Sequence, residues 1–130
     1  MGSGGLIPSL SVGVGGALGS LARYWLTVWA MPFSQRLPWS TIGINVVGSF
    51  VIGLVATLTL ASGRHPAPEW ARLFVMVGIC GGFTTFSSFS LQTLELLRLG
   101  AWGRALANVA LSVVLCLASV AAGYLFARAL

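Results

Sequence analysis

Residues 78–90 read GICGGFTTFSSFS and decide the fold, because they lie in the middle of a long apolar segment. Three glycines and five hydroxyl side chains gather in these 13 residues. Glycine lowers helix stability, and hydroxyl side chains compete for backbone hydrogen bonds. The stretch therefore predicts a break in a helix near residues 81–85, and the alternative is a straight helix that packs through its small residues. Unwound backbone in a bilayer is tolerated only where it is buried in protein or lines a watery cavity.

The composition of the chain indicates an integral membrane protein. Of the 130 residues, 57% are hydrophobic and only 7% are charged, whereas a soluble domain carries about 25% charged residues. A helix needs roughly 20 apolar residues to cross a bilayer, and four stretches reach that length. We therefore expect an all-α membrane protein with a single transmembrane domain over residues 1–130. The predicted spans are residues 9–31, 40–61, 70–99 and 102–127.

The charged residues indicate contact with lipid headgroups rather than with nucleic acid. All seven basic residues are arginines, two glutamates are the only acids, and six arginines flank the spans instead of forming one basic face. Three arginines are predicted on each side of the membrane, so no excess sets one orientation. This balance predicts an antiparallel, dual-topology homodimer, and the alternative is that another feature selects one orientation. The arginines are Arg36, Arg98 and Arg104 on one side, and Arg64, Arg72 and Arg128 on the other.

Two polar side chains inside the first two spans allow more than one interpretation. Arg23 lies within the first span, where it either reaches the interface, attracts anions to a vestibule, or caps carbonyl groups of a neighbouring helix. Asn45 lies on a polar face of the second span. Its amide supplies two N–H donors and one acceptor. It therefore either joins two helices or offers donors to a passing anion.

The fourth span carries a polar stripe at intervals of four, four and three residues. Its members are Asn108, Ser112, Cys116 and Ser119. The stripe is typical of a pore wall, although packing between helices would use the same spacing. The spans hold no acid–base pair, activated nucleophile or metal cluster, so we expect no enzyme. Neutral N–H and O–H donors, together with aromatic ring edges, suit a small and strongly hydrated anion such as fluoride.

Two other functions are compatible with four apolar helices. A proton-coupled exporter of the small dual-topology type needs a carboxylate deep in a span. The only span carboxylate, Glu95, is near a helix end, three residues before Arg98. The second alternative is an assembly subunit without transport activity, whose glycine and serine faces would only pack.

Three motifs together resemble the Fluc (CrcB) fluoride channels over nearly the whole chain. The run GGFTTFSSF at residues 81–89 is similar to the family's GGxTTFSTF signature, with Ser88 in place of threonine. The first span has GGxxGxxxR at residues 15–23, and the second has WxTxxxNxxG at residues 39–48. Asn108 and Cys116 stand where the family's polar track has tyrosine or serine, whereas Ser112 matches it.

The resemblance implies an antiparallel homodimer in a bacterial inner membrane, with two pores that export fluoride passively. It implies that backbone carbonyls of Gly81 and Thr84 from both subunits hold a central, structural sodium ion. Arg23 would shape an anion-attracting vestibule. The predicted pore residues are Asn45, Thr85, Phe86, Phe89, Asn108 and Ser112.

Overall fold

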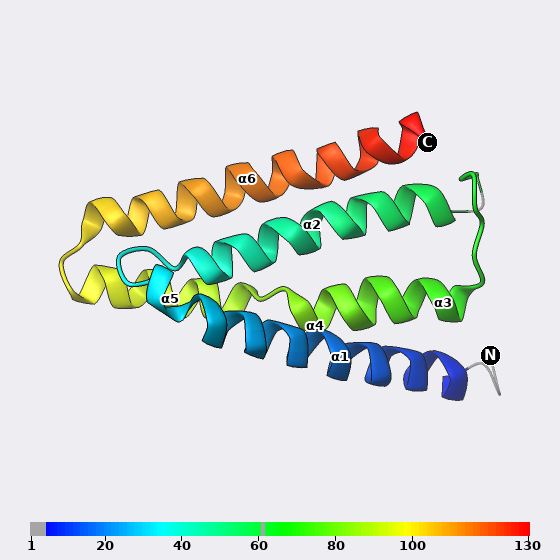
Figure 1. Cartoon of the computed structure of the whole chain (residues 1–130), viewed down its shortest axis with the longest axis horizontal. Coiled ribbons are helices and arrows are strands. Elements are labelled where there is room, and N and C mark those ends of the chain that lie inside the picture. Colours follow the sequence, from blue (N-terminus) through cyan, green and yellow to red (C-terminus); the bar gives the residue numbers. More distant parts are fainter. Residues whose placement is uncertain (1–4, 61) are drawn as a thin grey trace.

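A computed structural model describes residues 5–60 and 62–130, and over these residues the chain forms helices and no strands (Figure 1). The third membrane segment is divided into several elements, and one of them is a wide π-helical stretch. The elements are α1 (Leu6–Ala30), η2 (Met31–Phe33), α2 (Trp39–Thr59), α3 (Glu69–Leu73), η3 (Phe74–Cys80), α4 (Gly81–Phe83), α5 (Phe86–Arg98) and α6 (Trp102–Ala129).

Four helical segments are long and apolar enough to cross a membrane, which confirms the predicted number of spans. Each predicted boundary lies within three residues of the observed one, except that residue 61, the predicted end of the second span, lies outside the described residues. The observed segments are Leu6–Phe33, Trp39–Thr59, Glu69–Arg98 and Trp102–Ala129.

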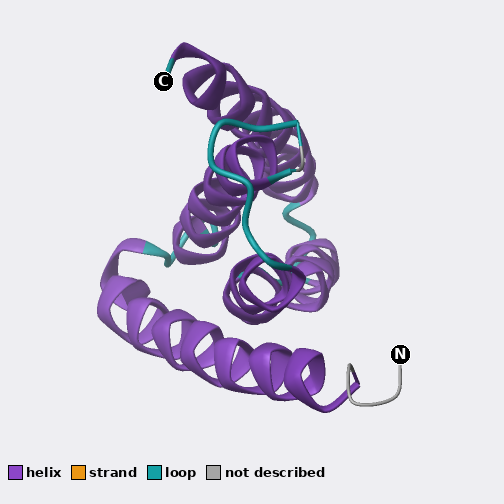
Figure 2. Cartoon of the chain, turned by 90° about the vertical axis from the view of Figure 1, so that its right-hand side faces the viewer, coloured by secondary structure: helices purple, strands orange, loops and turns teal. Residues whose placement is uncertain are grey.

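The helices lie in the spatial order α6, α2, third segment, α1, so α1 and α6 are on opposite sides (Figures 1 and 2). Glycines allow the two outer helices, α1 and α6, to approach their neighbours closely. A Cβ on Gly15 would collide with the backbone of η3, and one on Gly123 of α6 would collide with the carbonyl of Phe50 in α2. Small residues allow this approach between membrane helices. Gly15 and Gly19 of the first span therefore both allow close packing against the third segment.

A tight turn joins α5 to α6 and needs a glycine. Gly100 has a φ of 73°, in the left-handed region that glycine adopts without steric cost. The Ala101 N–H donates to the carbonyl of Leu96 at 2.8 Å, and the Gly100 N–H donates to Leu97 at 3.0 Å. These bonds satisfy the last carbonyls of α5. The turn reverses the chain, so α6 runs back along α2 (Figure 1).

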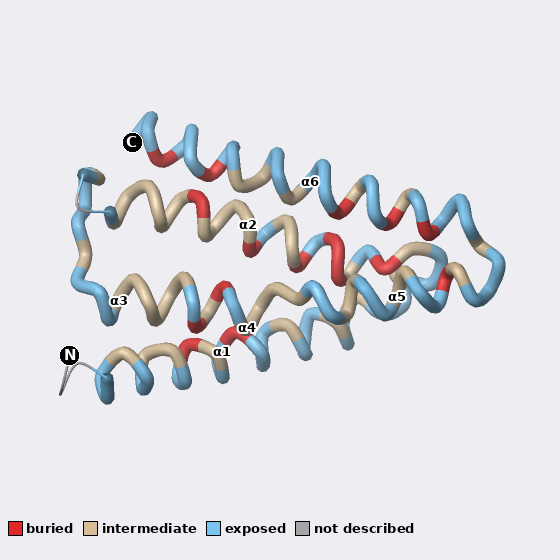
Figure 3. The backbone as a smooth tube through the Cα atoms, turned by 180° about the vertical axis from the view of Figure 1, so that it is seen from behind, coloured by how far each residue is buried: buried red, intermediate tan, exposed pale blue. Residues whose placement is uncertain are grey.

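The apolar core of the single chain is thin (Figure 3). Among the described residues, the buried hydrophobic side chains are few, whereas long runs of Leu, Val and Trp are exposed on α1 and α6. Such surfaces must be covered by lipid or by another protein surface. The buried hydrophobic residues are Ile42, Ile44, Cys80, Leu96, Ala105 and Ala127.

Candidate functional site

The backbone between α4 and α5 is extended at two residues. Thr84 has φ and ψ of −82° and 158°, and Thr85 has −151° and 116°. The hydroxyl of Thr85 then caps α5, because it accepts a hydrogen bond from the Ser88 N–H at 3.1 Å. The chain therefore leaves the helix after Phe83 and re-enters it at Phe86.

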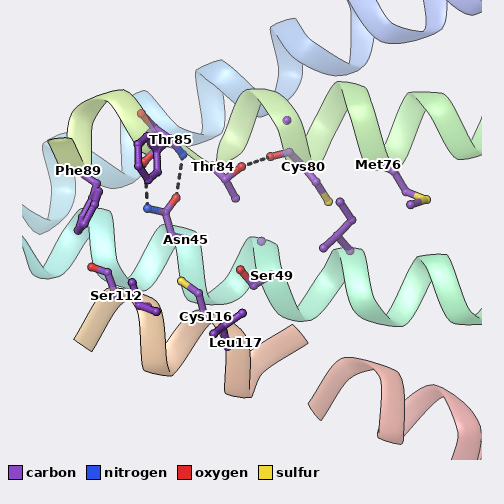
Figure 4. Close-up of a pocket in the computed structure, with 15 residues that line it drawn as sticks. Asn45, Ser49, Met76, Cys80, Thr84, Thr85, Phe89, Ser112, Cys116 and Leu117 are labelled. Carbon is purple, nitrogen blue, oxygen red and sulfur yellow. Dashed lines mark hydrogen bonds between the residues drawn. The ribbon is translucent and has the colours of Figure 1, made fainter. Parts of the chain in front are cut away.

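The side chain of Asn45 on α2 bonds to both backbone groups of Thr85 (Figure 4). Its Nδ2 donates to the Thr85 carbonyl at 3.1 Å, and its Oδ1 accepts from the Thr85 N–H at 2.8 Å. An extended residue inside an apolar layer has no helical partners, so the amide replaces the two missing bonds. One N–H of the amide is not required by these bonds and is free for a ligand.

This arrangement releases particular carbonyl groups from helical hydrogen bonding. In a helix the Gly81 carbonyl would accept from the Thr85 N–H, but that N–H donates to Asn45. The Thr84 carbonyl would accept from the Ser88 N–H, which donates to the Thr85 hydroxyl instead. Both of these carbonyl groups thus keep lone pairs for another partner.

Arg23 of α1 donates a hydrogen bond to a third carbonyl group next to the extended residues. Its Nε donates to the Gly82 carbonyl at 3.0 Å, and the side chain is half-buried. Of the interpretations that the sequence left open, the capping of a carbonyl on a neighbouring helix is the one that this geometry shows. The bond uses one of the five N–H groups of the guanidinium, so four remain for other partners.

An open groove of about 420 Å³ runs between α2, the third segment and α6 beside the extended step. Its wall is mainly apolar and, within the described chain, includes no charged side chain. Seven of the residues named in the sequence analysis for the pore or the cation site lie along it (Figure 4). They are Asn45, Gly81, Thr84, Thr85, Phe86, Phe89 and Ser112.

Two phenylalanines of α5 lie next to each other at the groove. The ring centroids of Phe86 and Phe89 are 5.4 Å apart, with an angle of 49° between the planes. Phe86 is 79% exposed in the single chain, whereas Phe89 is half-buried. Ring edges carry partial positive charge and suit an anion. The exposure of Phe86 leaves one side of this pair open to lipid or to another subunit.

The predicted pore residue Asn108 lies behind the groove rather than in its wall. Its side chain is fully buried, and Nδ2 donates to the hydroxyl of Thr93 on α5 at 2.9 Å. Ser112, one turn later, donates to Asn108 Oδ1 at 3.4 Å and does line the groove. The other two residues of the predicted stripe separate: Cys116 lines the groove, and Ser119 donates to the Val46 carbonyl.

A polar pair that was not predicted from the sequence joins α2 to α5. Gln92 Nε2 donates to the buried hydroxyl of Thr41 at 2.9 Å, and Gln92 Oε1 is a buried atom without a hydrogen-bond partner in the described chain. The available signal was the spacing of three residues that continues from Phe86 and Phe89 to Gln92. Ser49, which is on the polar face of the second span together with Asn45, also lines the groove, as does Met76, which no sequence signal identified.

Comparison with known proteins places the chain in a family. Residues 10–124 match the family model described as CrcB-like protein, Camphor Resistance (CrcB). A protein of Gluconobacter oxydans named fluoride-specific ion channel FluC is 64% identical over 119 residues, covering 91% of this chain and 83% of the relative. A protein of the same name from Methylobacterium radiotolerans is 63% identical over 114 residues, covering 88% and 80%.

A third relative, from Methylocella silvestris, has the same name and is 54% identical over 118 residues, covering 90% of each chain. The named relatives are ion channels, which supports the prediction that the chain is not an enzyme. The family match extends over most of the four membrane segments and includes the residues of the groove. The chain therefore belongs to the CrcB-like family.

Proposed function

We propose that the chain is a fluoride-selective channel that exports fluoride passively across a bacterial inner membrane. The observation that carries the proposal is the groove, in which uncharged donors and two phenylalanine rings meet at an extended backbone step. The name shared by relatives that are 54–64% identical supports the choice of ion.

The groove supports selectivity for fluoride through the kind of donors that it offers. The second N–H of Asn45 is a neutral donor in an apolar wall, and the hydroxyl of Ser112 becomes one when its proton turns from Asn108 to the groove. Neutral donors can replace part of the water around a small anion without holding it as tightly as a fixed positive charge would. Phe86 and Phe89 would add ring edges along the path. Arg23, with its remaining N–H groups, would raise the local concentration of anions at the vestibule.

Two observations support an antiparallel homodimer with two pores. The thin core and the 79% exposure of Phe86 leave one side of the groove incomplete in the single chain. Arginines are also balanced between the ends of the molecule. The two described ends of the chain and the loop near Arg64 lie at one end, and the loops near Arg36 and Gly100 lie at the other (Figure 1). A second copy in the opposite orientation would place equal charge in each leaflet.

The proposed orientation can be tested by labelling. A single cysteine at Gln35, in the loop after α1, is placed in a variant that lacks Cys80 and Cys116. In sealed cells we expect a membrane-impermeant maleimide to label about half of the copies, and permeabilisation to expose the rest. Labelling of all copies or of none before permeabilisation would show a single orientation.

The residues at the step fit a structural sodium ion. The Gly81 and Thr84 carbonyls have lost their helical donors, and carbonyl oxygen is a ligand that hard cations accept. No cluster of three or more His, Cys, Asp or Glu side chains occurs in the described chain, which disfavours a transition metal at this place. Contributed by two subunits, these carbonyls would hold one sodium ion, whose charge would offset repulsion between two anion paths.

The main test of the function is ion efflux from liposomes that contain purified protein. We expect fluoride to leave rapidly and chloride to stay, without any coupled movement of protons. A proton-coupled exporter, the second candidate, would acidify or alkalinise the lumen as fluoride leaves. An assembly subunit would release neither ion. Equal release of chloride and fluoride would contradict the proposed selectivity.

A further inference from the structure

Asn108 is the middle member of a directed chain of three hydrogen bonds behind the groove. The Ser112 hydroxyl donates to Asn108 Oδ1 at 3.4 Å, and Asn108 Nδ2 donates to the Thr93 hydroxyl at 2.9 Å. The Thr93 hydroxyl donates in turn to the Phe89 carbonyl at 2.8 Å. Asn108 itself has no exposed surface, so it acts on the groove only through its neighbours.

The direction of these bonds decides what Ser112 presents to the groove. A hydroxyl has one proton, and in this structure the proton of Ser112 points back to Asn108. The groove therefore faces oxygen lone pairs, which repel an anion. For Ser112 to donate to an anion, its proton must turn into the groove. If nothing else moved, Asn108 Oδ1 would lose its donor in a buried place, which is costly.

Reversal of the whole chain avoids that cost. If the amide of Asn108 turns over, the Thr93 hydroxyl donates to Oδ1, Nδ2 donates to the Ser112 oxygen, and the Ser112 proton is free for the groove. The number of hydrogen bonds is kept once an anion accepts from Ser112. The Phe89 carbonyl loses the Thr93 hydroxyl, but it is a carbonyl within α5 and still accepts from a backbone N–H.

The acceptors that other hydroxyl groups use indicate where the Ser112 proton would go without Asn108. On α5, the hydroxyl groups of Thr93 and Ser90 each donate to the backbone carbonyl four residues earlier, and the hydroxyl of Thr57 on α2 does the same. Ser112 differs because the side chain of Asn108, also four residues earlier, takes its proton. Without that amide, the Ser112 proton would turn to the backbone carbonyl of residue 108 and stay away from the groove.

We propose that Asn108 is a positioning residue that reverses its amide and thereby turns the Ser112 hydroxyl from acceptor to donor toward a fluoride ion in the groove. The proposal rests on the proposed function and adds to it a residue that does not touch the ion. It also explains how a buried asparagine supports a path that its own side chain does not line.

A double-mutant cycle on fluoride efflux tests the proposal. We expect Asn108→Leu and Ser112→Ala each to lower efflux about tenfold, the value of one hydrogen bond to a charged partner, and the double variant to be no slower than either. About a hundredfold loss in the double variant would overturn the proposal, because it would show independent roles. Ser119→Ala is the matched control, since it removes a hydroxyl of α6 that bonds outside the groove; we expect near wild-type efflux.

Thr93→Val provides a second test that does not rely on the folding of Asn108→Leu. Valine keeps the shape of threonine but can neither accept from Asn108 Nδ2 in the observed direction nor donate to Oδ1 in the reversed one, so each direction loses one hydrogen bond and neither is favoured. We expect efflux at low fluoride to stay close to that of the wild type. A loss as large as that expected for Asn108→Leu would overturn the proposal. Absence of fluoride efflux in the wild type would instead reject the proposed function.

Discussion

Replacement of Asn45 by leucine is expected to reduce fluoride efflux strongly and to lower the thermal stability of the purified protein. Leucine has a similar branched shape but no polar group, so the N–H and carbonyl of Thr85 both lose their partner. An unsatisfied buried backbone group costs about 1–3 kcal/mol, and two are left here. That sum is a large part of the stability of a small protein. We therefore expect efflux at least tenfold below wild type.

Asn45→Asp separates the fold from the conduction path. Aspartate keeps an acceptor for the Thr85 N–H but has no donor for the Thr85 carbonyl, and it adds negative charge to the groove. We expect a melting temperature between those of the wild type and Asn45→Leu, with efflux as low as in the leucine variant. Thr57→Val on the same helix is the control, because its hydroxyl bonds only within α2. Efflux within twofold of wild type in Asn45→Leu would contradict the role given to this amide.

The sequence predicted the spans because a bilayer imposes a simple requirement on composition. Pro38 and Pro68 stand directly before the first residues of α2 and α3, and Pro32 stands two residues after the end of α1. The set of residues expected to share a pore came from the family resemblance. Asn45, Phe89 and Ser112 lie on three different helices, and all three line the groove.

The local geometry of the third segment was less accessible from the sequence. The capping hydroxyl of Thr85 and its bond to Ser88 follow a common pattern of a hydroxyl residue three positions before the N–H that it caps. The partner of Thr85 could not be predicted, since it depends on which residue of α2 lies opposite it. The π-helical stretch Phe74–Cys80, which packs against α1, likewise has no sequence signal.

Asn108 shows the limit of helical periodicity as a guide to a pore. The spacing of four residues correctly placed Asn108 and Ser112 on one face of α6. It could not tell that α5 covers the end of that face, so that Asn108 is buried against Thr93 while Ser112 stays at the groove. A face of a helix predicts which residues are neighbours, and only the packing of the next helix decides which of them a ligand can reach.

The second large effect is expected from substitutions at two adjacent glycines, Gly81 and Gly82. A side chain at Gly82 would collide with the backbone of Gly16 in α1, whereas a Cβ at Gly81 meets no atom of the chain within 4 Å. Gly82→Leu is therefore expected to disrupt the packing of α1 on the third segment and to reduce the yield of folded protein strongly. Gly81→Leu is expected to leave the single chain folded, since its side chain has open space there.

The effect of Gly81→Leu therefore tests whether a second subunit contacts the chain at Gly81. In the proposed dimer, the Gly81 carbonyl and its counterpart meet at a central sodium ion, so a leucine at this position would separate the two subunits. We expect cross-linking and native mass spectrometry to show mainly monomer, and fluoride efflux to fall more than tenfold, while helix content by circular dichroism stays at the wild-type value. Gly81→Ala should have a smaller effect on both, because a methyl group reaches less far. A leucine variant that forms a stable dimer would reject the structural cation at this step, whether or not it conducts. Loss of efflux in such a dimer would show that the leucine fills the groove, which Gly81 also lines.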